Sequence, residues 1–186
     1  VGTEPSVTGR RHAVLTGLEE TDILPFGGHL TRVQTSGDAT TLLTYIPAFP
    51  IYPPETAWMR EADTLLPGLV VREPPGQGRV AYLPADIDRC FGRDNLPDHG
   101  DLLASTVRWA VGRELPLEVQ GGGLFDCQLY RQNQRLVLHI VNLTNPGAWR
   151  GPVHELVPVG PLVVRLRLPE ETAGADAHCL VSGHRP

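Results

Sequence analysis

The densest group of residues that could do chemistry lies between positions 86 and 101. It combines acidic, basic and imidazole side chains: Asp86, Asp88, Arg89, Arg93, Asp94, Asp98, His99 and Asp101. We expect this group at the carboxyl end of a strand and before a helix, where open α/β sheets place their ligands. Asp86 and Asp88, two residues apart in an extended segment, would point the same way and bind a hydroxylated ligand or a cation together.

A purely structural role is the competing interpretation of the same group. Asp98 suits the N-cap of a helix, and Arg89 would tie Asp86 or Asp88 into a loop. His99 has no His or Cys partner at metal-ligand spacing, so no metal site is predicted.

The sequence predicts no catalytic residue and no cofactor. No Ser–His–Asp or Cys–His pattern is present, and the three cysteines contain no C-x-x-C pair. All 16 basic residues are arginines, which excludes a phosphate-binding loop with its lysine and any lysine base or Schiff base.

Aromatic side chains on proline-rich segments offer a second kind of site. Residues 48–58 carry Tyr52 and Trp58 among prolines, a pattern that neither a helix nor a central strand tolerates. Trp149 lies in a similar connection at 142–161. These aromatics stack on sugar rings, pack against a partner, or fold inward to cover their own loop, and the sequence leaves these alternatives open.

The composition limits the class of protein. The chain has 186 residues, 41% of them hydrophobic, and a net charge of −5. This supports a packed core and argues against non-specific binding to nucleic acid or to an anionic membrane. No apolar run approaches the roughly 20 residues of a membrane span. We expect a soluble protein, with the bacterial cytoplasm favoured, and a first residue other than Met indicates an excised piece or an incomplete chain.

Residues 12–112 predict part of an α/β layer. Three segments have the apolar, β-branched character of strands: 40–47, 67–73 and 78–86. A turn separates the last two at 74–78. An amphipathic helix is predicted over 98–111 with Gly112 at its C′ position. Because strand, polar loop and helix in this order form half of a βαβ unit, we expect a partial flavodoxin-like or amidotransferase-like lobe over 1–113.

The composition changes after this lobe, and no further helix signal follows. Short strands are predicted at 124–132, 135–143, 161–169 and 177–183. In the first of them Phe125, Cys127 and Leu129 face inward, and the second reads as a central strand. Glycine and proline turns between short strands favour a small antiparallel β-sandwich over 114–186.

Residues 78–112 resemble the end of the glutamine-amidotransferase-like module called the β-galactosidase trimerisation domain. The matching residues are a turn at Gly78, Pro-x-Asp-Ile-Asp-Arg at 84–89, Pro-Asp-x-Gly at 97–100 and Arg-Trp-Ala at 108–110. In bacterial glycoside hydrolases this module follows a catalytic (β/α)8 barrel, and residues 136–169 are similar to the β-rich tail that comes after it. Only the second half of the module fits into this chain, without a glutaminase nucleophile and without the barrel that holds the two catalytic carboxylates.

The resemblance therefore implies a non-catalytic accessory or oligomerisation region of a glycoside hydrolase. Its partners would be the catalytic barrel, identical subunits, or both. One alternative is a carbohydrate-binding module with Trp58, Trp149 and the pair Asp86 and Asp88 as its sugar platform. Another is a stand-alone hydrolase or amidotransferase-like enzyme that uses one of those two aspartates or His99.

Overall fold

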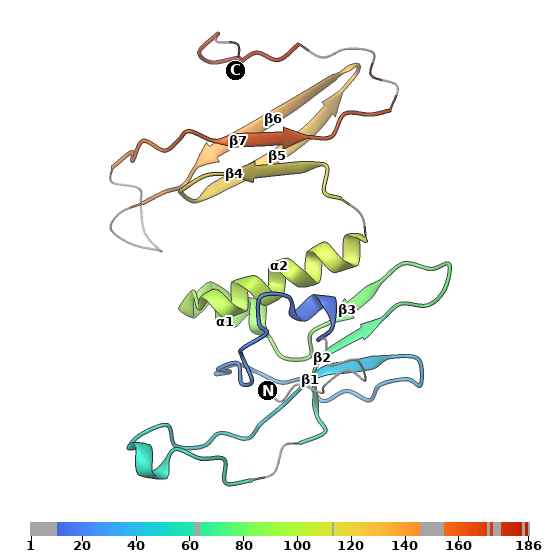
Figure 1. Ribbon diagram of the computed structural model, residues 1–186, viewed down its shortest axis with the longest axis vertical. Coiled ribbons are helices and arrows are strands. Elements are labelled where there is room, and N and C mark those ends of the chain that lie inside the picture. The colour runs from blue at the N-terminus through green and yellow to red at the C-terminus, as the bar shows by residue number, and fades with distance from the viewer. Residues whose placement is uncertain are drawn as a thin grey trace. The chain divides into compact units, whose positions relative to one another are not determined.

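The computed structural model describes residues 11–61, 64–112, 114–145, 155–170, 172, 176–183 and 185. The chain divides into two compact units, Val1–Glu114 and Leu115–Pro186. Both helices and antiparallel strands are present, so the protein is broadly of mixed α and β structure (Figure 1). Among the described residues, the helices are too short or too polar for any of them to traverse a lipid bilayer.

The first unit contains a three-stranded sheet in the order β1 (Thr40–Thr44), β2 (Pro67–Arg72) and β3 (Val80–Tyr82). Both neighbouring pairs run antiparallel. The turn at 74–78 explains the antiparallel pairing of β2 with β3, because parallel neighbours need a crossover of about a dozen residues or more. Helices follow β3, as the predicted order of strand, loop and helix requires, but the described strands of this sheet have no parallel neighbour.

The predicted strand at 78–86 is shorter than expected because Pro84 has no N–H to donate to a neighbouring strand. Beyond β3 the chain pairs with residues about 55 positions earlier in the sequence. Leu30 and Ala85 form an isolated antiparallel bridge. Residues 29–31 consequently lie beside the chain that enters the first helix.

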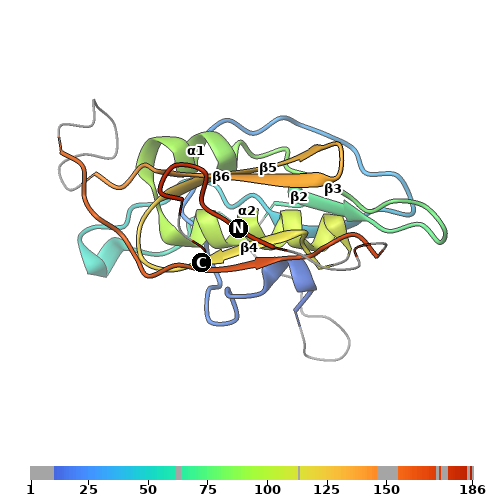
Figure 2. The ribbon, with the colours of Figure 1, turned by 90° about the horizontal axis from the view of Figure 1, so that it is seen from above.

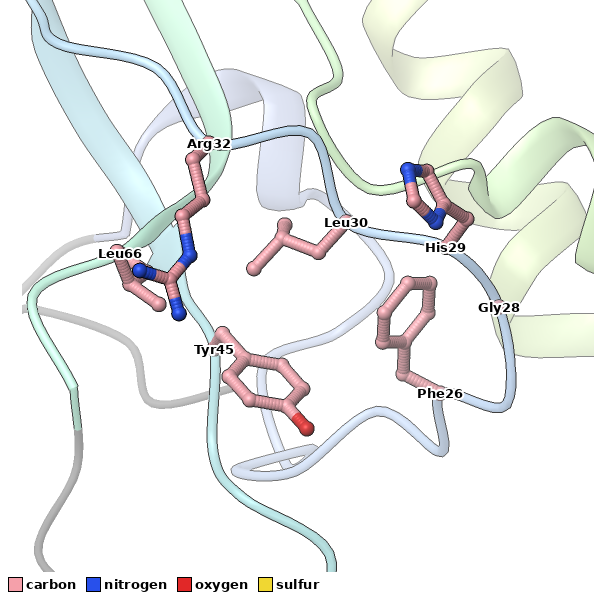
Figure 3. A pocket seen from close by; sticks show the side chains of 7 residues that line it. All are labelled: Phe26, Gly28, His29, Leu30, Arg32, Tyr45 and Leu66. Atoms are coloured by element: carbon pink, nitrogen blue, oxygen red, sulfur yellow. The ribbon is translucent and has the colours of Figure 1, made fainter.

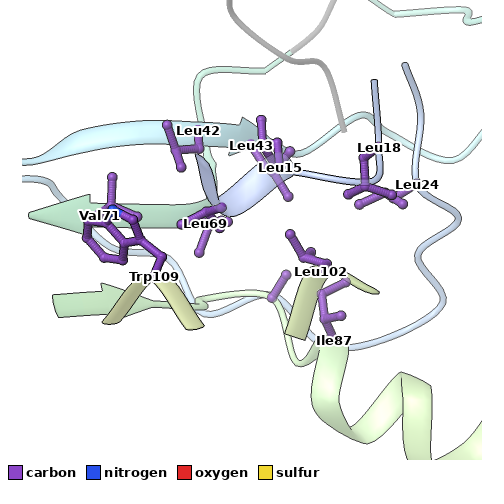
Figure 4. Close-up of a cluster of buried hydrophobic side chains, with 12 residues drawn as sticks. Leu15, Leu18, Leu24, Leu42, Leu43, Leu69, Val71, Ile87, Leu102 and Trp109 are labelled. Carbon is purple, nitrogen blue, oxygen red and sulfur yellow. The ribbon is translucent and has the colours of Figure 1, made fainter. Parts of the chain in front are cut away.

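The core of this unit lies between one face of the sheet, the short 3-10 helix η1 (Ala13–Leu15) and the helix α2 (Pro97–Val111). Figure 4 shows these side chains facing one another from strands and helices. The buried cluster comprises Val14, Leu15, Leu18, Leu24, Leu42, Leu43, Leu69, Val71, Ala85, Ile87, Leu102 and Trp109. Because each fully buried leucine contributes about 1.5–3 kcal/mol, this cluster is the main source of stability of the unit.

Two helices follow β3, and only the second was predicted. The first, α1 (Ile87–Asp94), occupies part of the expected polar loop. In α2, Pro97 is the first helical residue and Leu96 is the N-cap, so Asp98 belongs to the first turn and the predicted Asp98 N-cap is wrong. The predicted end of α2 is confirmed, because Gly112 adopts the left-handed conformation with φ of 67°.

The second unit contains two antiparallel pairs of strands. One joins β4 (Leu117–Gln120) to β7 (Val163–Leu166), which run side by side in both views (Figures 1 and 2). The other joins β5 (Phe125–Gln132) to β6 (Arg135–Asn142) through a tight turn in which Asn133 has a φ of 53°. The predicted inward face of β5 is confirmed, because its alternate residues are half-buried and the others are exposed.

Two strand predictions for this unit are wrong. β6 pairs only with β5 among the described strands, so it is not a central strand. Residues 177–183 form a loop and a turn. Leu180 and Val181 remain 74% and 102% exposed there, so no apolar burial stabilises a strand.

Candidate functional site

A proline-rich arm projects from the sheet between β1 and β2. We define this arm as residues 46–61 and 64–66. At its root the Tyr45 N–H donates a hydrogen bond to the Leu66 carbonyl at 2.9 Å, which extends the pairing of the two strands. The short 3-10 helix η2 (Pro54–Thr56) lies at the far end of the arm, away from the sheet (Figure 1). The root of the arm is thus bound to the sheet, while the end that carries η2 lies away from the sheet.

The arm carries large apolar side chains that are open to solvent. Ile51, Tyr52 and Leu65 are 83%, 82% and 91% exposed, and Trp58 and Met59 are about half exposed. Large exposed apolar side chains on one segment are typical of surfaces that contact another molecule. The structure brings the two predicted candidates, Tyr52 and Trp58, onto this one arm.

The two faces of the Trp58 ring are not equivalent. The Arg60 guanidinium lies 4.4 Å from the centroid of this ring, in a cation–π contact. The same side chain donates a hydrogen bond to the Thr56 carbonyl at 3.4 Å, which holds it over the ring. A partner that stacks on Trp58 therefore has to use the opposite face or displace Arg60.

A pocket of about 260 Å³ opens at the root of the arm (Figure 3). It is lined by Phe26, Gly28, His29, Leu30, Arg32, Tyr45 and Leu66. Phe26 and Tyr45 meet edge to face, with 6.3 Å between their ring centroids. The Arg32 side chain extends into the pocket toward Tyr45 and Leu66. Within the part of the chain that the structure describes, Arg32 has no hydrogen bond or ion pair.

Sequence reasoning missed this pocket because its residues come from separate segments. One segment spans 26–32, and single residues are added at 45 and 66. The only local signal was the pair Gly27 and Gly28 beside an aromatic residue, which indicates a close approach of the backbone rather than a ligand.

Asp86 is a structural anchor at the beginning of α1. Its Oδ1 accepts a hydrogen bond from the His29 N–H at 2.7 Å, and its Oδ2 accepts one from Arg89 Nε at 2.5 Å. Burial raises the pKa of this carboxyl, but the hydrogen bonds from Arg89 and His29 outweigh it and hold the pKa below the ordinary value of 3.8. Asp86 is therefore a carboxylate that joins α1 to the segment at 29–31.

The predicted pairing of Asp86 with Asp88 is wrong. Asp86 is the N-cap of α1 and Asp88 lies in its first turn, where the side chain is exposed. Residues two apart on a helix do not face one another, whereas the prediction assumed an extended segment. Arg89 is the true partner of Asp86, as the structural interpretation anticipated.

His99 lies in the core rather than on a binding surface. It is 1% exposed, and its Nε2 is 2.8 Å from the Pro25 carbonyl oxygen. Because a carbonyl only accepts, Nε2 is the donor in this contact, and Nδ1 is buried without a hydrogen-bond partner. Cys90 is also buried, and burial together with the nearby Asp86 raises the pKa of its thiol, which keeps the thiol protonated.

One face of the sheet in the first unit is left partly uncovered. Thr41, Val70 and Tyr82 are aligned across the three strands and lie on the face opposite the buried Leu69 and Val71. Tyr82 is 50% exposed. On this surface, which we call the outer face, Tyr82 is exposed and Thr41 and Val70 are half-buried.

The remaining predicted candidate, Trp149, lies outside the described residues. Among the residues that are described, no three His, Cys, Asp or Glu side chains come together as a potential metal site. No family model matches the sequence, and the comparisons with curated proteins and with solved structures found no match either.

Proposed function

We propose that this chain is a non-catalytic accessory and oligomerisation region of a glycoside hydrolase, and that its arm packs against a second copy of the chain. The observation that carries the proposal is the exposure of Ile51, Tyr52 and Leu65 on the arm. Prolines stiffen this segment, so less conformational freedom is lost when it packs against a partner. The resemblance of residues 78–112 to a trimerisation module is consistent with such a role.

The outer face supports the same proposal. A sheet needs cover on its apolar face, and among the described elements η1 and α2 pack against the side that carries Leu69 and Val71. In the proposed fold, the three antiparallel strands form the margin of an amidotransferase-like layer. Large α/β sheets often combine parallel strands with an antiparallel edge of this kind. The remaining strands and the cover of Val70 and Tyr82 would then come from protein outside these residues.

The polar residues near α1 favour an accessory role over catalysis. Asp86 is neutralised by Arg89, and His99 donates to a backbone carbonyl inside the core. A general acid or base needs a side chain that can reach a substrate and exchange a proton with it. These groups are engaged in holding α1 and α2 to the rest of the unit.

Sedimentation of the chain over a range of concentrations tests the proposal. We expect the wild type to form oligomers, and the double variant Tyr52→Ser/Trp58→Ser to sediment as a monomer, because it removes two exposed aromatic anchors. Tyr130→Ser is the matched control, since Tyr130 is about as exposed as Trp58 but lies on β5. A wild-type chain that remains monomeric, or an arm variant with an unchanged mass, contradicts the proposal.

A carbohydrate-binding module is the second candidate, and the exposed Tyr52 and Trp58 favour it. Aromatic rings on a surface loop stack on sugar rings, and the free face of Trp58 suits this contact. Calorimetric titration with a panel of oligosaccharides tests this candidate. Binding that is lost in Trp58→Ala would support it, whereas a flat trace across the panel would leave only the assembly role.

A further inference from the structure

We propose that the pocket at the root of the arm binds a small carboxylate that carries a single six-membered ring. This proposal does not depend on oligomerisation, because Phe26, Leu30, Arg32, Tyr45 and Leu66 all belong to one unit of one chain. The ligand class follows from the charge, the walls and the size of the pocket.

The charge of the pocket comes from Arg32. Its guanidinium extends into the cavity beside Tyr45 and Leu66 (Figure 3). The described residues provide no carboxylate partner for it, since no ion pair or hydrogen bond of Arg32 occurs there. An exposed arginine without a counter-charge attracts an anion, and its planar fork matches the two oxygens of a carboxylate.

The walls of the pocket are suited to a ring. Phe26 and Tyr45 meet at 83° between their planes, so one ring presents its edge to the other. Leu30 and Leu66 add aliphatic surface. The C–H groups of a sugar or the face of an aryl ring pack against such a surface. The Tyr45 hydroxyl adds one polar group that would orient the bound ring.

The size of the pocket suits a small ligand. Its volume of about 260 Å³ lies just below the ~300–1,000 Å³ range of pockets for drug-sized ligands. A single six-membered ring with a carboxylate fits in this space next to Arg32.

The pocket walls are held in place before a ligand arrives. The segment that carries Gly28 is fixed on one side by the hydrogen bond from the His29 N–H to Asp86. On the other side, Arg93 donates a hydrogen bond to the Gly27 carbonyl at 3.0 Å. Tethers of this kind reduce the ordering that binding would otherwise require.

Titration calorimetry of the whole chain with four probes tests the proposal. Glucuronate and benzoate carry both a ring and a carboxylate, glucose carries only the ring, and acetate carries only the carboxylate. We expect glucuronate or benzoate to bind with a Kd of about 1 mM, and glucose and acetate to bind at least about tenfold more weakly. The stronger of the first two probes shows whether the ring is a sugar or an aryl group.

Substitution of Arg32 provides the second part of the test. Arg32→Gln should weaken binding of the ring carboxylate about tenfold or more, because it removes a charge-assisted hydrogen bond. Arg32→Lys should bind the ring carboxylate more weakly than the wild type but more tightly than Arg32→Gln, since lysine keeps the charge but lacks the planar guanidinium. Arg108→Gln, an exposed arginine on α2, is the control and should bind as the wild type does.

Three results would overturn the proposal. One is the absence of heat from both ring carboxylates at concentrations of about 10 mM, well above the expected Kd. Another is equal binding of the ring carboxylate by Arg32→Gln and the wild type. The third is equal binding of glucose and glucuronate, which would make the charge irrelevant. Because Arg32 is exposed, circular dichroism should show that its variants fold normally.

Discussion

The imidazole of His12 and the indole of Trp109 meet edge to face, with 5.3 Å between their centroids and 66° between their planes. This contact fastens η1 to the last turn of α2, two elements that are almost 100 positions apart in the chain. His12 Nδ1 also accepts a hydrogen bond from the Val14 N–H at 3.2 Å, which caps η1. Only an unprotonated Nδ1 can accept this hydrogen bond. Protonation of His12 therefore removes the cap of η1 and changes the charge of the ring that contacts Trp109.

The stability of the first unit should therefore decrease as the pH falls below about 6.5. Burial lowers the pKa of His12 from its ordinary value of 6.5, and the nearby Arg79 adds to the effect while Glu73 opposes it. The folded state thus binds fewer protons than the unfolded state in this range, and the free energy of unfolding rises with pH until both states hold His12 neutral.

Urea unfolding at pH 5.5 and at pH 7.5 measures this effect. His12→Asn is the comparison, because asparagine keeps an N-cap acceptor but does not titrate. We expect a smaller difference between the two pH values in His12→Asn than in the wild type. Equal differences in the two proteins would show that His12 has no part in the pH dependence.

Asp86 should matter for stability, whereas Asp88 should not. Asp86→Ala removes acceptors for the His29 N–H and for Arg89, which should cost about 2 kcal/mol of unfolding free energy. Asp88→Ala removes an exposed carboxylate in the first turn of the same helix and should cost only about 0.5 kcal/mol. Denaturant unfolding of both variants compares them directly. Equal losses would contradict the different roles that the structure gives to the two aspartates.

The same aspartate should also make the protein sensitive to acid. Since the pKa of Asp86 is lower in the folded state than its ordinary value of 3.8, its ionised form stabilises the fold above about pH 4. This contribution is lost as the pH falls through the lower, folded-state pKa. Acid titration followed by circular dichroism should show that loss in the wild type and a shallower change in Asp86→Asn.

Local patterns in the sequence predicted some of the elements well. The alternating pattern of β5 and the glycine that ends α2 depend on residues close together in the sequence, so both can be recognised before the fold is known. The helix α1 was missed because most of its residues are polar. Its burial depends on Ile87 and Cys90, which contact elements from elsewhere in the chain.

The site was predictable only in part, for the same physical reason. Tyr52 and Trp58 belong to the same short proline-rich segment, and their shared arm follows from that composition. The pocket depends on the loop that carries Arg32 coming to lie beside Tyr45 and Leu66 at the ends of β1 and β2, a placement that no local pattern determines. A site whose residues come together only in the folded structure therefore cannot be predicted from local sequence patterns.

Leu69 and Leu65 provide a matched test of the core. Leu69 is fully buried on β2, whereas Leu65 is 91% exposed on the arm only four positions earlier. Leu69→Ala should lower the unfolding free energy by about 2–5 kcal/mol, because it leaves a cavity between the sheet and the helices. At concentrations at which the chain is monomeric, Leu65→Ala should change it by no more than about 0.5 kcal/mol. Similar losses for the two variants would mean that the described core is wrong.

Gly28 should not tolerate even a methyl group, because it connects the pocket to the anchor at Asp86. A Cβ at this position would collide with the Asp86 carboxylate and would lie 2.6 Å from the Cys90 sulfur and 2.8 Å from the Phe26 ring. Those neighbours are themselves held by hydrogen bonds and by the core, so relief requires the segment at 26–29 to move. Gly28→Ala should therefore cost about 1–3 kcal/mol of unfolding free energy, as overpacking does elsewhere.

Gly37→Ala is the control for this substitution, since a Cβ there meets no atom within 4 Å. It should leave stability unchanged or raise it by up to about 1 kcal/mol, because alanine restricts the unfolded chain more than glycine does. Denaturant unfolding of the two variants separates steric collision from backbone freedom. If Gly28→Ala were as stable as Gly37→Ala, the close packing of Gly28 against Asp86 would be refuted, and with it the rigid pocket wall.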